Sequence, residues 1–166
     1  MKITVIYFLS FTFGLFCFYT RKVSYMERKK RSDTYIEPMP KVKFMELMRE
    51  FKSIGGKYIC NEESDSFLKN QNAEASTVDG YTILFRKKPS RSAVYEELFH
   101  AKQYREGKAD GTYKRILECE IEAQEYLLDN SELLELTGPE IMHTRKLLDC
   151  YKKLLKELKG GDNDDL

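Results

Sequence analysis

Three residues near the middle of the chain have the types and the spacing of a metal-binding helix motif. They are Glu96, Glu97 and His100, in the stretch SAVYEELFHAKQYREG. On an α-helix, positions 96 and 100 project from one face, one turn apart. The motif H-E-x-x-H presents two metal ligands at this spacing, with its glutamate beside them as a general base. Glu96 then takes the first ligand position, Glu97 the general-base position and His100 the second ligand position.

The first ligand position holds a glutamate where the motif has a histidine. A carboxylate oxygen binds Zn²⁺ as well as an imidazole nitrogen does, so Zn²⁺ remains the expected ion. The exchange adds negative charge and makes the ligand set harder, which also admits Mn²⁺ or Fe²⁺. The competing interpretation is an acidic, solvated helix face that carries a histidine by chance.

A third ligand is expected from the next helix, in the stretch ECEIEAQEYLL. Sites built on H-E-x-x-H take this ligand from a following helix, often as a glutamate in an E-x-x-A-D-like run. Glu120 is the preferred third ligand here and Glu122 the reserve, with Gln124 at a position that often holds an acid. Carboxylates gathered beside one histidine repel one another and raise their own pKa values, and a bound cation would resolve that conflict.

The elements that must position these residues can be predicted from periodicity and turn residues. Helical spacing of apolar residues begins at Lys41 and is stopped by the pair at 55–56, and KYIC (57–60) reads as a short strand. Residues 61–72 are polar, with room for one helical turn. Asp79-Gly80 predicts a two-residue hairpin turn between strands at 73–78 and 81–87.

Helices are expected over 92–106, over 113–129 and from the Gly138-Pro139 pair onward. The order of elements predicts an α+β fold, with a small antiparallel sheet packed on a helical half that contains the metal-site helix. The strand at 81–86 is expected to offer a free edge, on which an extended peptide substrate could add as a further strand.

Composition narrows the function classes. The 166 residues carry 28 Lys and Arg against 27 Asp and Glu, so no global charge favours nucleic acid as a partner. Only two histidines occur, His100 and His143, so a metal site must draw its other ligands from carboxylates or cysteines. The four cysteines form no C-x-x-C pair and are expected to be mostly reduced thiols, with a bridge from Cys60 to Cys119 or Cys150 as the alternative.

The chain divides into four parts by composition. Residues 1–20 are a hydrophobic segment whose run at 3–19 has no charged residue, and 21–40 read as a basic linker. Residues 41–159 form the domain, and 160–166 are an acidic tail expected to be disordered. The apolar run is short for a membrane helix, and the basic flank after it would place the domain in the cytoplasm. The alternatives are a signal for secretion or delivery, or a translation start near Met26 that leaves no membrane segment.

Several blocks of the sequence, in order, resemble the zincin-like metallopeptidase toxin domains of bacterial polymorphic toxin systems. The blocks are FKSIGGKYICNEESDSFL, NAEASTVDGYTILFRKKPSRSAVYEELFHAKQYREGKADGTY and EIEAQEYLL, and the similarity covers about 42–158. The resemblance implies a zincin-like fold, a metal-dependent peptidase acting on a protein or peptide, and a cognate immunity protein. It places ligands or catalysts at Glu96, Glu97, His100 and Glu120. Gln103, one turn beyond His100, falls at a glutamine of the family pattern and would orient a ligand or substrate.

Two rival functions come from other classes. The first is a degenerate zincin that acts as a binding module, which the missing first histidine favours. The second is a di-iron protein, because both histidines lie in an E-x-x-H pattern, Glu97–His100 and Glu140–His143, and Glu46 and Glu120 would supply two further ligands.

Overall fold

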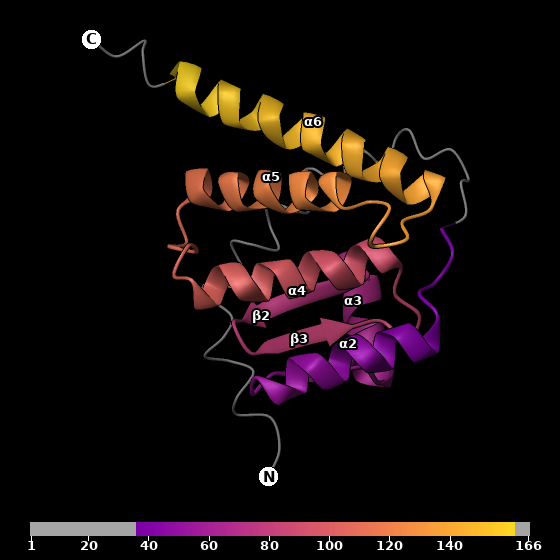
Figure 1. Ribbon diagram of the computed structural model, residues 1–166. Coiled ribbons are helices and arrows are strands. Elements are labelled where there is room, and N and C mark those ends of the chain that lie inside the picture. Colours follow the sequence, from indigo (N-terminus) through magenta and orange to yellow (C-terminus); the bar gives the residue numbers. More distant parts are fainter. Residues whose placement is uncertain (1–35, 162–166) are drawn as a thin grey trace. The chain divides into compact units, whose positions relative to one another are not determined.

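The structure, a computed structural model, describes residues 36–161, and these residues form an α+β fold. They contain five helices and one three-stranded sheet (Figure 1). In chain order the elements are α2 (Lys41–Ser53), β1 (Lys57–Ile59), α3 (Glu62–Gln71), β2 (Ala75–Asp79), β3 (Thr82–Phe85), α4 (Arg91–Arg105), α5 (Tyr113–Asp129) and α6 (Gly138–Gly161).

The sheet is mixed, and its strand order is β1-β3-β2. β2 and β3 form the predicted antiparallel hairpin, whereas β1 pairs with β3 in parallel. The predicted all-antiparallel sheet was therefore wrong for β1, because a strand of three residues carries no pattern that fixes its direction. β3 lies in the middle, so the prediction of a free edge at 81–86 was also wrong. Of the two hairpin strands, β2 is the one at an edge.

The hairpin turn lies one residue later than predicted. Asp79 still belongs to β2 and pairs with Thr82, so the turn consists of Gly80 and Tyr81. The side chain of Asp79 accepts a hydrogen bond from the Tyr81 backbone N–H at 2.7 Å. A Cβ atom on Gly80 would stand 2.7 Å from Cγ of Arg105 and 3.3 Å from its backbone nitrogen, so this close approach to α4 favours glycine.

The polar segment after β1 folds as the ten-residue helix α3, longer than the single turn predicted there. A capping box begins it: the side chain of Asn61 accepts from Ser64 N–H, and the Ser64 hydroxyl accepts from Asn61 N–H. Asn72 ends it in the left-handed conformation, with a φ of 56°. Both capping signals are local, so the helix was readable from the sequence despite its low apolar content.

The structure differs from the prediction at the start and at the end of the domain. Residues 38–40 belong to the fold, because Pro38 bridges to Ser90 and the buried Met39 donates its N–H to the Pro89 carbonyl at 2.8 Å. The predicted linker thus ends earlier than residue 40. At the other end α6 continues to Gly161, two residues past the predicted end of the domain.

The core joins α2, the sheet and α4. Phe44 packs edge-to-face against Phe85, with ring centroids 5.3 Å apart, and Ile83, Phe85 and Val94 are fully buried. α4 lies along β2 and β3, α5 lies against α4, and α6 covers α5 (Figure 1). This order sets α4 between the sheet on one side and α5 on the other.

No helix among the residues that the structure describes is long and apolar enough to cross a membrane. The hydrophobic run at 3–19, its basic flank and residues 162–166 lie outside the described residues. Cys60 and Cys119 are thiols, so neither of the bridges considered for Cys60 forms.

Candidate metal centre

Glu96, His100 and Glu120 come together as a group that can hold a metal ion. Each offers one ligand atom, and these atoms all lie within 4.8 Å of one another. The first two are one turn apart on α4, as their spacing predicts, and the third comes from α5. No other such group is found in the part of the chain that the structure describes.

The two carboxylates of the group lie close to one ring nitrogen, that of His100. Nε2 of His100 lies 3.9 Å from Oε1 of Glu96 and 3.8 Å from Oε2 of Glu120. The side chains of His100 and Glu120 are only 6% and 4% exposed, and that of Glu96 is 20% exposed. Glu96 is therefore the member of the group nearest to solvent.

Two further residues, neither of which the sequence singled out as a site residue, hold the carboxylates. Gln124 is fully buried on α5, and its Nε2 donates to Oε1 of Glu96 at 2.7 Å. Tyr151, buried on α6, donates its hydroxyl to Glu120. Both residues lie on helices that the sequence predicted, but the sequence does not specify which side chains meet where α4, α5 and α6 pack.

Burial and mutual repulsion change how the group titrates. Burial raises the pKa of Glu96 to about 8, and the charge of Glu120 adds to the increase while His100 opposes it. Burial likewise raises the pKa of Glu120. For His100, burial lowers the pKa, but the three carboxylates around it, Glu120 foremost, outweigh burial and raise it to about 9. The cluster therefore retains protons at neutral pH that a cation would have to displace.

Glu97, the predicted general base, lies beside the group and faces the sheet. Its Oε2 accepts a hydrogen bond from the backbone N–H of Thr77 at 2.5 Å, and its carbonyl oxygen accepts from the Thr77 hydroxyl at 2.8 Å. Thr77 belongs to β2, an edge strand. The carboxylate of Glu97, the predicted general base, is thus fixed between the edge of the sheet and the metal group, by which we mean Glu96, His100 and Glu120.

Gln103 and Glu122, the predicted supporting residues, lie next to the group but outside it. Oε1 of Gln103 is 2.8 Å from Nδ1 of His100, as the prediction of an orienting role requires. Glu122, the reserve ligand, instead accepts from Gln103 and from Lys108, at 3.1 Å and 3.0 Å. Glu122 lies two residues along α5 from Glu120, and it is Glu120 that joins Glu96 and His100.

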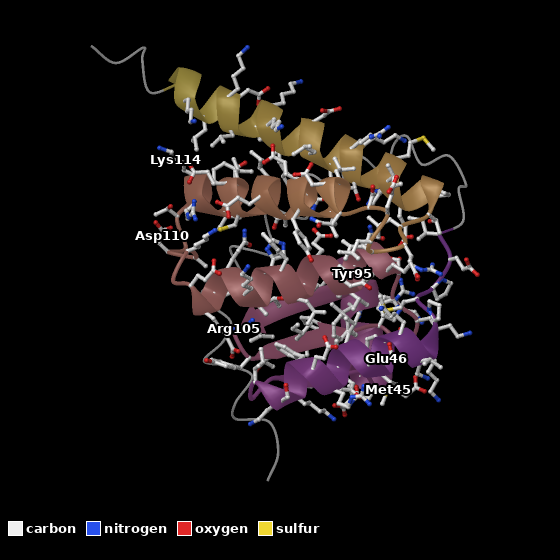
Figure 2. The ribbon with its side chains drawn as sticks, in the orientation of Figure 1. Met45, Glu46, Tyr95, Arg105, Asp110 and Lys114 are labelled. Atoms are coloured by element: carbon white, nitrogen blue, oxygen red, sulfur yellow. The ribbon has the colours of Figure 1, made fainter. Side chains whose placement is uncertain are left out.

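The residues of the di-iron alternative do not assemble. Glu140 is fully buried, and its two oxygens accept from the backbone N–H groups of Ser92 and Thr137. Glu46 is exposed on α2, well away from α5 (Figure 2). Neither residue, nor His143, joins the metal group.

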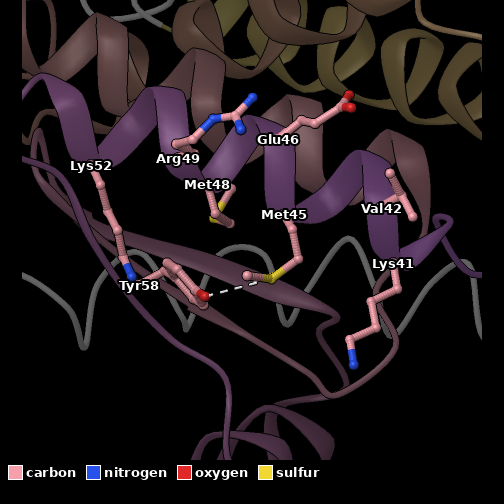
Figure 3. A pocket seen from close by; sticks show the side chains of 8 residues that line it. All are labelled: Lys41, Val42, Met45, Glu46, Met48, Arg49, Lys52 and Tyr58. Carbon is pink, nitrogen blue, oxygen red and sulfur yellow. Dashed lines mark hydrogen bonds between the residues drawn. The ribbon is translucent and has the colours of Figure 1, made fainter.

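A groove of about 660 Å³ lies elsewhere, along α2 (Figure 3). It combines exposed apolar side chains with three cations and a single acid, and the Tyr58 hydroxyl approaches the Met45 sulfur at 3.9 Å across it. The groove contains no cluster of metal-ligating groups. Its lining is Lys41, Val42, Met45, Glu46, Met48, Arg49, Lys52 and Tyr58.

Comparison with family models, with curated proteins and with solved structures found no match to this chain.

Proposed function

We propose that the chain is a metal-dependent peptidase of the zincin type, which binds one divalent ion through Glu96, His100 and Glu120. One observation carries the proposal: two carboxylates and an imidazole from two packed helices converge within 4.8 Å, with Glu97 adjacent to them. An acidic helix face that carried a histidine by chance would point its carboxylates into water, whereas the Glu96 side chain is only 20% exposed and accepts a hydrogen bond from the buried Gln124.

The donor set fits a zinc ion. Two donors bound to one tetrahedral Zn²⁺ stand about 3.3 Å apart, given metal–ligand distances near 2.0–2.1 Å. The separations of 3.8 and 3.9 Å from His100 to the two carboxylates exceed this value by about half an ångström, and the three ligand atoms all lie within 4.8 Å of one another. Three protein ligands leave a fourth position for water or substrate, as in catalytic zinc sites. Mn²⁺ and Fe²⁺ suit the two carboxylates as well.

When bound, the ion would supply Lewis-acid chemistry, which lowers the pKa of a water and polarises a carbonyl. In this mechanism Glu97 accepts a proton from the attacking water and passes it to the nitrogen of the leaving amine. The edge of β2 is the neighbouring place for an extended peptide, since Thr77 already directs a backbone N–H toward Glu97. A peptide that binds there must share or replace that hydrogen bond.

Metal analysis of the full chain tests the proposal. We expect about one zinc, manganese or iron ion per chain in the wild type and loss of that ion in His100→Ala. His143→Ala is the matched control, because it removes the other histidine and leaves the group intact. Two irons per chain would favour the di-iron alternative, and equal metal content in wild type and His100→Ala would contradict the assigned site.

We further propose, on the resemblance of its sequence blocks, that the peptidase is a toxin module with a cognate immunity protein. The hydrophobic run at 3–19 suits either a membrane anchor with a cytoplasmic domain or a delivery signal. The test is growth arrest on expression in a bacterial host. Arrest by the wild type and normal growth with Glu97→Gln are expected, and equal toxicity of the two chains would contradict a toxic peptidase.

A second candidate is a zincin-like binding module that does not cut. The near-complete burial of His100 and Glu120 favours it, because buried side chains leave a substrate little access to the group. Such a module would keep its metal and lack peptidase activity in the wild type. A peptide library incubated with the metal-loaded chain separates the two candidates.

A further inference from the structure

We infer that Gln103 and Glu122 are positioning residues that fix the proton of His100 on Nδ1 and so direct Nε2 to the metal. The inference deepens the proposed function and rests on it. It begins from the amide of Gln103, which is 2% exposed and has every polar atom engaged.

The orientation of this amide follows from its partners. Its Nε2 donates to the carbonyl oxygen of Cys119 and to Oε2 of Glu122, both at 3.1 Å. These partners only accept, so the two N–H groups must point to them. Rotating the amide by half a turn would set Oε1 against both of these oxygens. Oε1 must therefore face His100.

The orientation of the amide determines the tautomer of the histidine. Oε1 of Gln103 lies 2.8 Å from Nδ1 of His100, and an oxygen acceptor at this distance requires a proton on Nδ1. The neutral ring then carries its lone pair on Nε2, the atom that lies 3.8 Å and 3.9 Å from Glu120 and Glu96. Ligating histidines are commonly oriented in this way, through a hydrogen bond on the other ring nitrogen.

Glu122 can orient the Gln103 amide because other contacts fix its own carboxylate. The side chains of Lys108 and Arg115 both pair with its carboxylate. Lys108 follows α4, its Nζ lies 3.0 Å from Glu122, and its N–H donates to the Gln103 carbonyl at 2.9 Å. The same contacts tie α4, which carries Glu96 and His100, to α5, which carries Glu120. One network thus sets both the ring nitrogen and the spacing of the two helices.

Two measurements on the full chain test these roles. The first is ¹⁵N NMR of histidine in the metal-free chain at alkaline pH, where His143→Asn leaves a single histidine and assigns the signals. We expect neutral His100 to be protonated on Nδ1. A proton on Nε2 would overturn the inference, and this readout decides it even if the wild type binds no metal, a result that would instead refute the proposed function.

The second measurement is Zn²⁺ affinity by competition with a chelator. Loss of such an outer contact typically weakens metal binding about 10- to 100-fold, and we expect values in this range for Gln103→Leu and Glu122→Gln. Glu118→Gln is the matched control, since Glu118 is a similarly exposed acid on α5 that pairs with Arg115 and not with Gln103. Unchanged affinity in Gln103→Leu or in Glu122→Gln would contradict the assigned roles.

Discussion

Glu96 and Glu120 are carboxylates in surroundings that disfavour their charge. Isolated buried carboxylates usually become neutral, because the loss of hydration is costly. Here each accepts a hydrogen bond from a buried donor, Gln124 for Glu96 and Tyr151 for Glu120. These donors favour the ionised form, in opposition to the effect of burial. The hydrogen bonds thus stabilise the two negative charges only in part, and a divalent cation would supply the remaining stabilisation.

Replacement of Glu97 by Gln separates proton transfer from metal binding. We expect the peptidase rate to fall about 10²- to 10⁴-fold, the usual contribution of a general base. Metal content should not change, because Glu97 is not in the metal group. The variant keeps an oxygen that can accept from Thr77, so its fold is retained. Hydrolysis of a fluorogenic peptide library and elemental analysis measure the two quantities, and a rate equal to that of the wild type would remove Glu97 from its role.

Metal affinity should rise with pH. His100 with a pKa of about 9 and Glu96 with a pKa of about 8 hold protons at neutral pH, and the metal must displace them. The apparent affinity is therefore expected to increase as pH rises to about 9 and then to level off. Calorimetry in buffers of different ionisation enthalpy should also detect protons released on binding. An affinity independent of pH would show that the group does not bind the metal.

The free energy of unfolding of the metal-free chain should fall as pH rises from neutral to about 9. Both pKa values are raised above the ordinary values of 4.5 for Glu96 and 6.5 for His100. A group of this kind contributes stability below its unfolded pKa and loses that contribution as pH rises through its folded pKa. The stabilisation that a metal adds, measured as a shift in melting temperature, is therefore expected to grow from neutral pH to about 9.

At the scale of elements, Glu140 connects the beginnings of α4 and α6. Its carboxylate accepts from Ser92 N–H in the first turn of α4 and from the N–H and hydroxyl of Thr137, the residue before α6. These N–H groups have no partners within their own helices, and a carboxylate at a helix N-terminus also interacts favourably with the helix dipole. One buried side chain thus fixes where two helices start.

Glu140→Ala should destabilise the fold by about 3 kcal/mol, because it leaves buried donors without acceptors. Glu140→Gln keeps one acceptor oxygen and should cost less. Urea unfolding gives both values. Glu125→Ala is the control, since Glu125 forms only an exposed pair with Lys152 and should change stability by less than about 1 kcal/mol. A loss for Glu140→Ala as small as the control's would contradict the capping role.

Elements with strong local signals were predictable, and those defined by distant pairing were not. The bounds of α5 were predicted to the residue, and those of α4 within one. The direction of β1 was not predictable, because it follows from pairing with β3 more than 20 residues away. That Glu140 contacts the beginnings of both α4 and α6 was not predicted, for the same reason. Its E-x-x-H spacing is a local pattern, whereas its contact with Ser92 joins residues far apart in the sequence.

At the scale of the molecule, one core supports the helix that carries the site. Phe85 is fully buried between α2 and α4, and Phe85→Ala should lower the free energy of unfolding by about 3–5 kcal/mol. Val42→Ala, at a side chain that is 73% exposed, should change it by less than about 0.5 kcal/mol. Denaturant unfolding measures both, and similar values for the two variants would contradict this view of the core.

The candidate site was predictable to the extent that it is helical. The spacing of Glu96 and His100 placed both on one face of α4, and the following helix was the expected source of Glu120. Tyr151 could not be foreseen, because the packing of α6 over α5 brings it to Glu120 from about 30 positions away. Packing of whole helices determines such contacts, and periodicity within a helix does not report them.

The three members of the metal group are close in the chain as well as in space. They lie between residues 96 and 120, on consecutive helices joined by the short segment 106–112. Closing a short loop costs little entropy, and contacts that are local in sequence form early in folding. A metal ion present during synthesis would therefore have its three donors before α6 is complete. The ion would then act as a template for the order in which the helical half assembles.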